Sequence, residues 1–237
     1  MKILSIECSA TPCSVAVWED GKIIGSSFVN VKLTHSQTLM PMVKSVLDAS
    51  LLKMSDIDGF AVSAGPGSFT GIRIGISAVK GMAVSKKLPC YSVSTLRAMA
   101  ENYNDMDCII CAVMDARCNQ VYNALFEVVD GCVKRICDDR ALLCEELATE
   151  IEKNSVTGKK IIIIGDGAEV FYPFVMNLEN VVMASEHRRF QNAVGVVKAA
   201  EKDILNNDFL IPEDLNPIYL RLPQAERELK LKKENKK

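Results

Sequence analysis

The chain has 237 residues, of which 49% are hydrophobic and 24% charged, proportions that exclude collagen-like, low-complexity and wholly disordered proteins. It carries 28 basic and 30 acidic residues, a net charge of −2, which argues against a surface that is basic throughout and made for nucleic acid. No charge-free apolar run approaches the ~20 residues of a membrane span, and the opening MKILSIECSA has no signal-peptide pattern. We therefore expect a cytoplasmic protein with no membrane partner.

The cysteine usage predicts reduced thiols. There are nine cysteines, an odd number, and most lie in apolar segments, which fits core thiols better than a disulfide framework. Cys108 and Cys111 form a CxxC pair, but in a strand two residues three positions apart point to opposite faces. We expect no metal site.

The first half of the chain predicts the order βββαβαβα. Asp20–Gly21 is a hairpin signal between two β-rich runs, and helical periodicity begins after it. The predicted strands are Lys2–Ile6, Ser14–Trp18, Lys22–Val29, Asp58–Ser63 and Cys90–Val93, and the predicted helices are Ser36–Leu52, Phe69–Ser85 and one that ends near Tyr103.

The second half predicts the same order again, with Asp130–Gly131 as the repeated turn. The predicted strands are Ile109–Met114, Gln120–Val128, Cys132–Cys137, Lys160–Ile164 and Val181–Ala184, and the predicted helices are Leu142–Lys153, Ala168–Met176 and Arg189–Asn206. We expect an α/β protein of two similar lobes around a cleft, with an N-terminal lobe at 1–105, a C-terminal lobe at 106–223 and a basic tail at 224–237.

A glycine-rich loop occupies Ser63–Gly75, SAGPGSFTGIRIG, between a predicted buried strand and a helix. Backbone amides at such a place can hold an anion. However, Gly65, Gly67 and Gly71 have the spacing GxGxxxG, and no Lys-Ser/Thr follows as in a Walker loop. A tight turn with close helix packing is the alternative interpretation.

The segment SAGPGSFTGIRIGISAVKG closely resembles the hallmark of the bacterial TsaB (YeaZ) family, within the acetate kinase/Hsp70/actin (ASKHA) superfamily. Further similar segments run along nearly the whole chain: ILSIECSATPCSVAV, THSQTLMPMV, LPCYSVSTL, MDARCNQVY, IIIIGDGA and NPIYLR. The resemblance implies two RNase H-like lobes. It also implies a non-catalytic partner of the TsaD transferase in forming N6-threonylcarbamoyladenosine in tRNAs that read codons beginning with A. A TsaE-like ATPase, tRNA reached through the complex, and a second copy of the chain are further implied partners.

The residues at the family's functional positions indicate no catalysis, no metal binding and at most weak nucleotide binding. Counting from Gly75, Thr95 and Met99 stand where the transferase paralogue has metal-binding histidines, and neither can replace an imidazole. The chain has only His35 and His187, so we expect no catalytic residues and no metal. Glu7, Asp115, Gly165 and Gly167 are candidates for weak ATP or ADP contact, although Glu7-Cys8-Ser9 lacks the superfamily's glycine. No cofactor is expected to be required.

Two other functions remain open at this point. A glycoprotease-like peptidase would need a serine beside a base, for which Ser63, Ser68 and His35 are the candidates, yet GPGSF is not a GxSxG elbow. A small-molecule kinase of the same fold is the second alternative, and the missing glycine after Glu7 argues against it.

The helix Phe69–Ser85 is the candidate partner surface, because Arg73 and Lys80 are its only charged residues and small residues permit close helix approach. A second apolar set, Met42, Ala49 and Met54, is predicted beside it. Burial of both helices in a deep core is the alternative. The candidate interface residues are Met42, Gly71, Gly75, Ser77, Gly81 and Ser85.

The tail at 224–237 has six basic and three acidic residues and is either a solvated end or a tRNA contact.

Overall fold

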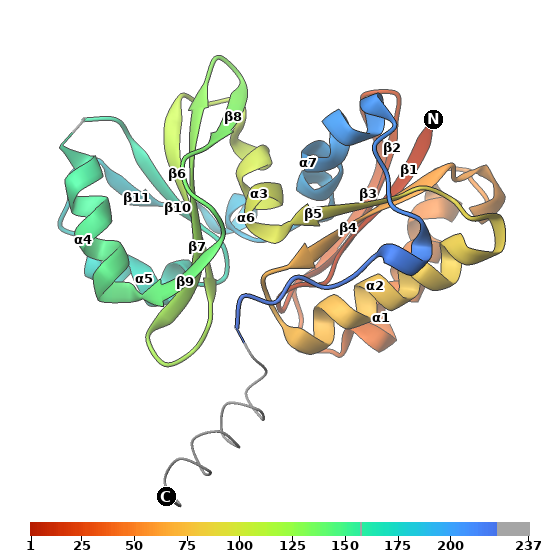
Figure 1. The fold of residues 1–237 in the computed structure, drawn as a ribbon, viewed down its shortest axis with the longest axis horizontal. Coiled ribbons are helices and arrows are strands. Elements are labelled where there is room, and N and C mark those ends of the chain that lie inside the picture. Colours follow the sequence, from red (N-terminus) through yellow and green to blue (C-terminus); the bar gives the residue numbers. More distant parts are fainter. Residues whose placement is uncertain (157, 222–237) are drawn as a thin grey trace, which may run out of the picture.

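Two sheets with the same topology form the fold, one in each lobe (Figure 1). The computed structural model describes residues 1–156 and 158–221, so the expectations for the tail at 224–237 lie outside the described residues. The first sheet has the order β3-β2-β1-β4-β5. Its strands are β1 (Lys2–Glu7), β2 (Cys13–Glu19), β3 (Lys22–Val29), β4 (Gly59–Gly65) and β5 (Cys90–Ser94).

The second sheet repeats this arrangement with the order β8-β7-β6-β10-β11, and β9 pairs additionally with β7. Its strands are β6 (Cys108–Asp115), β7 (Gln120–Val129), β8 (Cys132–Arg135), β9 (Arg140–Leu143), β10 (Ile161–Ile164) and β11 (Val181–Met183). In both sheets the first three strands are antiparallel and the last two run parallel to the first. The prediction of two similar α/β lobes is confirmed.

The two predicted Asp-Gly turns close equivalent hairpins in the two lobes. Asp20 and Gly21 have φ values of 46° and 89°, and Asp130 and Gly131 have 51° and 74°. Positive φ at both central residues is what a two-residue hairpin turn requires, and Asp-Gly tolerates it. These local signals were therefore sufficient to predict both hairpins.

Helices cover the sheets where the chain offers an apolar stripe. The α-helices are α1 (His35–Ala49), α2 (Phe69–Ala83), α3 (Thr95–Ala100), α4 (Cys144–Ser155), α5 (Ala168–Phe171), α6 (Glu186–Arg189) and α7 (Ala193–Asn206). Short 3-10 helices lie at Met54–Asp56, Val84–Lys86, Glu101–Tyr103, Tyr172–Phe174 and Pro212–Asp214. The core of the first lobe, which includes Leu4, Val15 and Phe60, holds buried side chains of α1 and α2. Among the described residues, no helix is long and apolar enough to cross a membrane.

The division into 1–105 and 106–223 differs from the structure at α3 and α7 (Figure 1). Helix α7 returns to the first lobe, where Val196 and Ile204 pack against Ile3, Trp18 and Tyr91. In the opposite direction, α3 carries Met99 into the core of the second lobe. Each helix packs apolar side chains into the lobe opposite to the one in which the predicted division places it. The linear order of elements does not reveal this packing.

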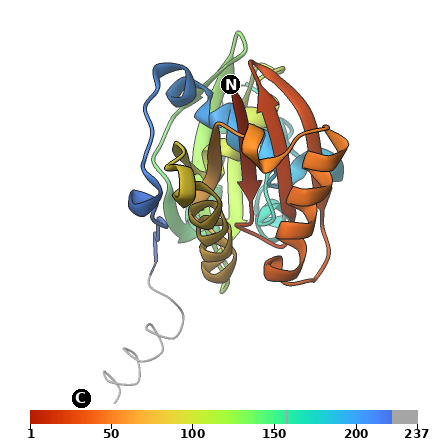
Figure 2. The same cartoon turned by 90° about the vertical axis from the view of Figure 1, so that its right-hand side faces the viewer.

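The residues after α7 also belong to the first lobe. Leu210 pairs with Cys90, and the chain then descends beside α2, as Figures 1 and 2 both show. Lys80 Nζ donates to the carbonyl of Glu213 over 3.1 Å, and Arg73 Nε donates to Tyr219 Oη over 2.7 Å. This C-terminal segment, residues 207–221, therefore flanks α2.

Three element boundaries differ from the predictions for physical reasons. The predicted helix from Leu142 begins instead at Cys144, because residues 140–143 form β9 against β7. The predicted helix Ala168–Met176 ends at Phe171 and gives way to a 3-10 turn that contains Pro173. The predicted helix from Arg189 is interrupted before Ala193, where the Asn192 side chain caps α7 by accepting from the Gly195 amide.

The CxxC cysteines point as expected to opposite faces of the second sheet. Cys108 packs in the cluster with Ile110 and Met99, and Cys111 packs in the cluster with Val113 and Leu147 on the other face. Both thiols are fully buried, so the two are not arranged as a pair.

Candidate functional site

Of the predicted glycine loop, only residues 66–68 lie between β4 and α2, and the whole segment is packed tightly against the rest of the chain. The Ser68 amide donates to the carbonyl of Ser9 over 2.6 Å, and the Ser68 hydroxyl caps α2 by accepting from the Gly71 amide. A Cβ on Gly67 would lie 2.4 Å from the Ser9 carbonyl oxygen, and one on Gly65 would lie 2.3 Å from that of Ile218. These glycines thus permit close backbone contact, which favours the tight-turn interpretation.

Glu7 and Asp115 end the equivalent strands β1 and β6, and Gly165 and Gly167 follow β10, but the four candidate nucleotide residues offer little to a phosphate. The Gly165 amide donates to the carbonyl of Arg189 over 2.7 Å, and the Gly167 amide donates to that of Val113 over 3.2 Å. Glu7 is fully buried and accepts from the Ser63 hydroxyl and the Ser9 amide. Of the four, Asp115 alone is exposed. The chain's own groups therefore occupy most of the hydrogen-bonding capacity expected to contact nucleotide.

Asp166 is a further acidic residue close to Asp115 and Glu7, and it was not among the candidates predicted from the sequence. Its pKa is raised from the ordinary value of 3.8 to about 6, first by burial and then by the charges of Asp115 and Glu7, while the hydrogen bond from Gln191 opposes the shift. Burial likewise raises the pKa of Glu7. The signal was present in IIIIGDGA, where an acid stands between two glycines at the end of a buried strand.

Thr95 and Met99, the positions of the paralogue's metal histidines, are both buried in α3. Met99 is 1% exposed and packs with the apolar core of the second lobe. Its Sδ lies 3.1 Å from the position of a Cβ on Gly165. A thioether in close apolar packing is a core side chain, so Met99 serves the core of the second lobe.

The serines considered as nucleophiles have structural roles. Ser63 Oγ donates to Glu7, and Ser68 Oγ caps α2. The ring of His35 is hydrogen bonded through Nε2 to the carbonyl of Ala10, at 2.7 Å. A serine nucleophile needs its base within hydrogen-bond reach, and the hydrogen bonds made by Ser63 and Ser68 direct them elsewhere.

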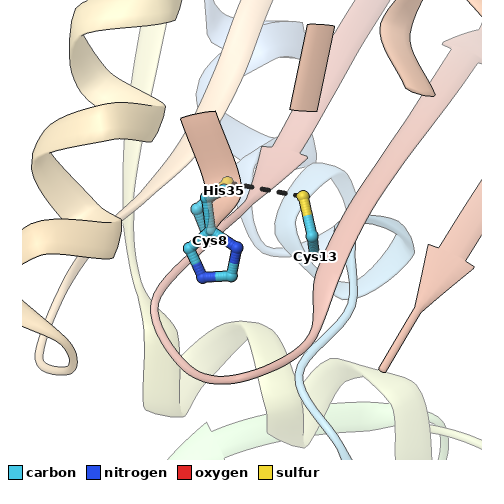
Figure 3. Close-up of side chains that lie close together, drawn as sticks. All are labelled: Cys8, Cys13 and His35. Atoms are coloured by element: carbon cyan, nitrogen blue, oxygen red, sulfur yellow. Dashed lines mark hydrogen bonds between the residues drawn. The ribbon is translucent and has the colours of Figure 1, made fainter. Parts of the chain in front are cut away.

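The structure instead brings His35 beside Cys8 and Cys13 (Figure 3). The two sulfur atoms are 3.8 Å apart. The hydrogen bond with Cys8 is the largest cause that lowers the pKa of Cys13, to about 5, and His35 adds to the effect. Interaction with Cys13 in turn raises the pKa of His35. The sequence pattern does not predict this contact, because it depends on the β1–β2 connection meeting the start of α1.

The candidate interface residues divide into an inner and an outer set. Met42, Gly71 and Gly75 are buried within the first lobe, so the expectation that they form an open surface is corrected. Helix α2 approaches the sheet through Gly71, where a Cβ would lie 2.1 Å from the Cys8 carbonyl oxygen. Ser77 and Gly81 are exposed on α2, Ser85 is exposed in the 3-10 turn that follows it, and Thr70 and Arg73 are exposed nearer the start of α2. We call these five residues the α2 outer face.

Comparison with known proteins identifies the family. Residues 30–216 match the family model described as TsaD, tRNA N6-adenosine threonylcarbamoyltransferase. The chain is also 30% identical over 224 residues to the tRNA threonylcarbamoyladenosine biosynthesis protein TsaB of Escherichia coli K12, covering 93% of this chain and 95% of that protein. The chain belongs to the TsaB family. The TsaB protein of Bacillus subtilis 168 is 27% identical over 95% of this chain and 96% of its own length.

The fold agrees with the family. The solved structure described as YeaZ from Pseudomonas aeruginosa has a TM-score of 0.78 and 26% identity, covering 92% of this chain and 99% of that one. By contrast, the tRNA N6-adenosine threonylcarbamoyltransferase of Kosmotoga olearia is 32% identical over only 40% of this chain and 34% of its own length. The likeness to TsaB proteins therefore spans the fold, whereas the likeness to that transferase is partial.

Proposed function

We propose that the chain is a non-catalytic TsaB subunit that supports a TsaD-like transferase in forming N6-threonylcarbamoyladenosine in tRNAs that read codons beginning with A. The observation that carries the proposal is the near full-length similarity to TsaB proteins. Burial of Thr95 and Met99 supports it, since a threonine and a thioether in the core supply no replacement for two metal-binding imidazoles. We therefore assign transfer of the threonylcarbamoyl group to the TsaD-like partner.

The proposal places the transferase contact on the α2 outer face. Ser77, Gly81 and Ser85 are exposed there and small, and nothing lies within 4 Å of a Cβ on Gly81. Small side chains let a partner helix approach closely. Arg73 lies over the Phe69 ring at 3.7 Å and is hydrogen bonded to Tyr219, which gives this face a preorganised polar end. A second copy of the chain is the competing occupant.

Further partners follow from the same role. A TsaE-like ATPase would act on the complex, and tRNA would be reached through it, with the basic tail at 224–237 as an added contact. Nucleotide contact by this chain is proposed to be weak, to centre on exposed Asp115, and not to require a bound cofactor. Work on tRNA places the protein in the cytoplasm, which its nine unpaired cysteines support.

Reconstitution tests the role. Purified chain, threonylcarbamoyl-AMP and unmodified tRNA are expected to yield no modified nucleoside, and product is expected only after a TsaD-like protein is added. Omission of this chain from the complete mixture is expected to reduce product formation. Transfer by the chain alone would overturn the non-catalytic role, and an unchanged rate without the chain would overturn the supporting one.

A further inference from the structure

Cys8, Cys13 and His35 come from three different segments and converge on one point in the first lobe (Figure 3). Cys8 directly follows β1, Cys13 begins β2 and His35 begins α1. Both cysteines are 2% exposed. Their sulfur atoms and a ring nitrogen of His35 all lie within 4.8 Å of one another. The fold therefore gathers two thiols and an imidazole that the proposed role in tRNA modification does not use.

The orientation of His35 leaves one nitrogen free. Its Nε2 lies 2.7 Å from the carbonyl oxygen of Ala10, which can only accept, so Nε2 carries a proton and Nδ1 is the nitrogen left for another partner. Nδ1 is buried and has no hydrogen-bond partner. The Cδ2 edge of the ring faces Gly71, where a Cβ would lie 3.1 Å away, so Nδ1 is on the opposite edge. An imidazole held by a backbone carbonyl in this way is typical of a metal ligand.

The spacing of the sulfur atoms fits a common coordination geometry. Zinc–sulfur bonds of about 2.3 Å at a tetrahedral angle place two sulfurs about 3.8 Å apart, and the Cys8–Cys13 separation is 3.8 Å. A disulfide would require about 2.05 Å. The observed separation thus suits two thiolates on one ion without movement of the backbone.

We propose that Cys8, Cys13 and His35 bind a zinc ion through two sulfurs and Nδ1, with the fourth position open to water. Binding displaces whatever protons remain on the two sulfurs and on Nδ1, so Zn²⁺ and two thiolates form a neutral centre, which avoids an uncompensated charge in the interior. His35 is partly exposed and provides the access route. The site joins the β1–β2 connection to α1, directly beneath Gly71 of α2. The expectation of no metal rested on the two histidines being far apart in the sequence and on the opposed CxxC pair, and neither pattern reveals that His35 meets Cys8 and Cys13 in the fold.

Cobalt is the probe, because its spectrum reports ligand type and geometry. The full chain, freed of metal and reduced with a non-thiol reductant, is titrated with Co²⁺ and then with Zn²⁺. We expect sulfur-to-cobalt charge-transfer absorption and strong visible bands of tetrahedral Co²⁺, saturating at one ion per chain and abolished by Zn²⁺. Weak octahedral bands alone would overturn the proposal, and this measurement on the unaltered protein needs no variant to fold.

Variants assign the ligands. Cys8→Ser, Cys13→Ser and His35→Gln are each expected to weaken Co²⁺ binding at least about 10-fold, the range seen even for loss of an outer-shell partner. The matched control replaces the two exposed cysteines, Cys118 and Cys132, by serine and is expected to bind as the unaltered protein. Circular dichroism without metal verifies that each variant is folded. Unchanged binding by the folded ligand variants, or loss of binding in the control, would refute the site.

Discussion

The amide of Ile218 donates a hydrogen bond to the carbonyl of Ala64 across 2.7 Å. This bond fixes the C-terminal segment beside β4, immediately before the glycine loop. Leu215 is fully buried in the core of the first lobe, and Arg221 Nη1 donates to the carbonyl of Ala116 in the second. The segment after α7 is therefore a structural element that joins both lobes.

Leu215 and the basic tail are expected to differ sharply in their effect on stability. Leu215→Ala removes a fully buried side chain and should lower the free energy of unfolding by about 2 to 5 kcal/mol. Deletion of residues 224–237, with six basic and three acidic residues, should leave the melting temperature nearly unchanged while weakening salt-sensitive tRNA binding by the complex. Thermal and urea unfolding check the stabilities; a deletion as costly as Leu215→Ala would show that the tail is structural.

Prediction from sequence succeeded where the determining interactions are local. The Asp20–Gly21 hairpin depends on two residues that accept positive φ, and α2 begins where Ser68 can cap it. These signals lie within a few positions of the structure they determine. The repeated strand order followed from them, because each hairpin and each following helix appears twice.

Prediction failed where distant segments decide the outcome. Helix α7 carries an apolar stripe that would suit either sheet, and only the packing of Val196 against the first lobe shows which one it covers. The pKa of Asp166 is raised by burial and then by the charges of Asp115 in the second lobe and Glu7 in the first. Likewise, the approach of His35 to Cys8 depends on how closely α1 and α2 pack on the sheet, which periodicity within one helix does not specify.

Asp166 is expected to make stability depend on pH in an unusual direction. Its pKa is raised to about 6 in the folded chain, so between pH 4 and 6 the folded state keeps a proton that the unfolded state has released. This contribution to stability is therefore present at low pH and lost as pH rises through 6. The unfolding free energy of the unaltered protein minus that of Asp166→Asn should fall by about 1 to 3 kcal/mol from pH 4 to pH 7, measured by urea unfolding.

Asp105 provides a control of opposite sign. Its hydrogen bond with Arg188 lowers the pKa of Asp105, so its contribution to stability is present above its ordinary pKa and lost as pH falls. The corresponding difference for Asp105→Asn should rise between pH 2 and pH 5. A flat difference curve for Asp166→Asn would contradict burial of this carboxyl at the lobe junction.

Gly165 is expected to be required for packing. It has a φ of 102°, and a Cβ there would lie 1.9 Å from the carbonyl oxygen of Val113. Gly165→Ala should therefore destabilise the protein by well over ~1 kcal/mol. Gly131 also has a positive φ, but a Cβ there would lie 3.7 Å from its nearest neighbour, the carbonyl oxygen of Asn104. The stability loss of Gly131→Ala therefore measures the cost of the backbone conformation without a steric clash. Equal stability losses in urea unfolding, together with loss of ADP binding only in Gly165→Ala, would instead favour a phosphate-binding role.

The two sides of α2 can be separated by placing leucine at Gly75 or Gly81. At Gly75 a Cβ already lies 3.5 Å from Cys8 Cβ and from Val62 Cγ2. The remaining atoms of leucine must enter a filled core, and overpacking of this kind costs about 1 to 3 kcal/mol. Gly81 faces open space, and a glycine inside a helix costs about 0.8 to 1 kcal/mol relative to alanine. Gly81→Leu should therefore preserve or raise the stability of the free chain.

Affinity for a TsaD-like protein then decides whether the α2 outer face is the contact surface. Gly81→Leu and Ser77→Leu should weaken the association while leaving the melting temperature of the free chain at least as high, because a branched side chain blocks close approach of a partner helix. Thr149→Leu, an exposed position on α4 of the other lobe, controls for added surface hydrophobicity and should bind normally. Calorimetric titration of each variant measures this. If Gly75→Leu alone weakens binding, and only as far as it destabilises the fold, the partner docks on another face.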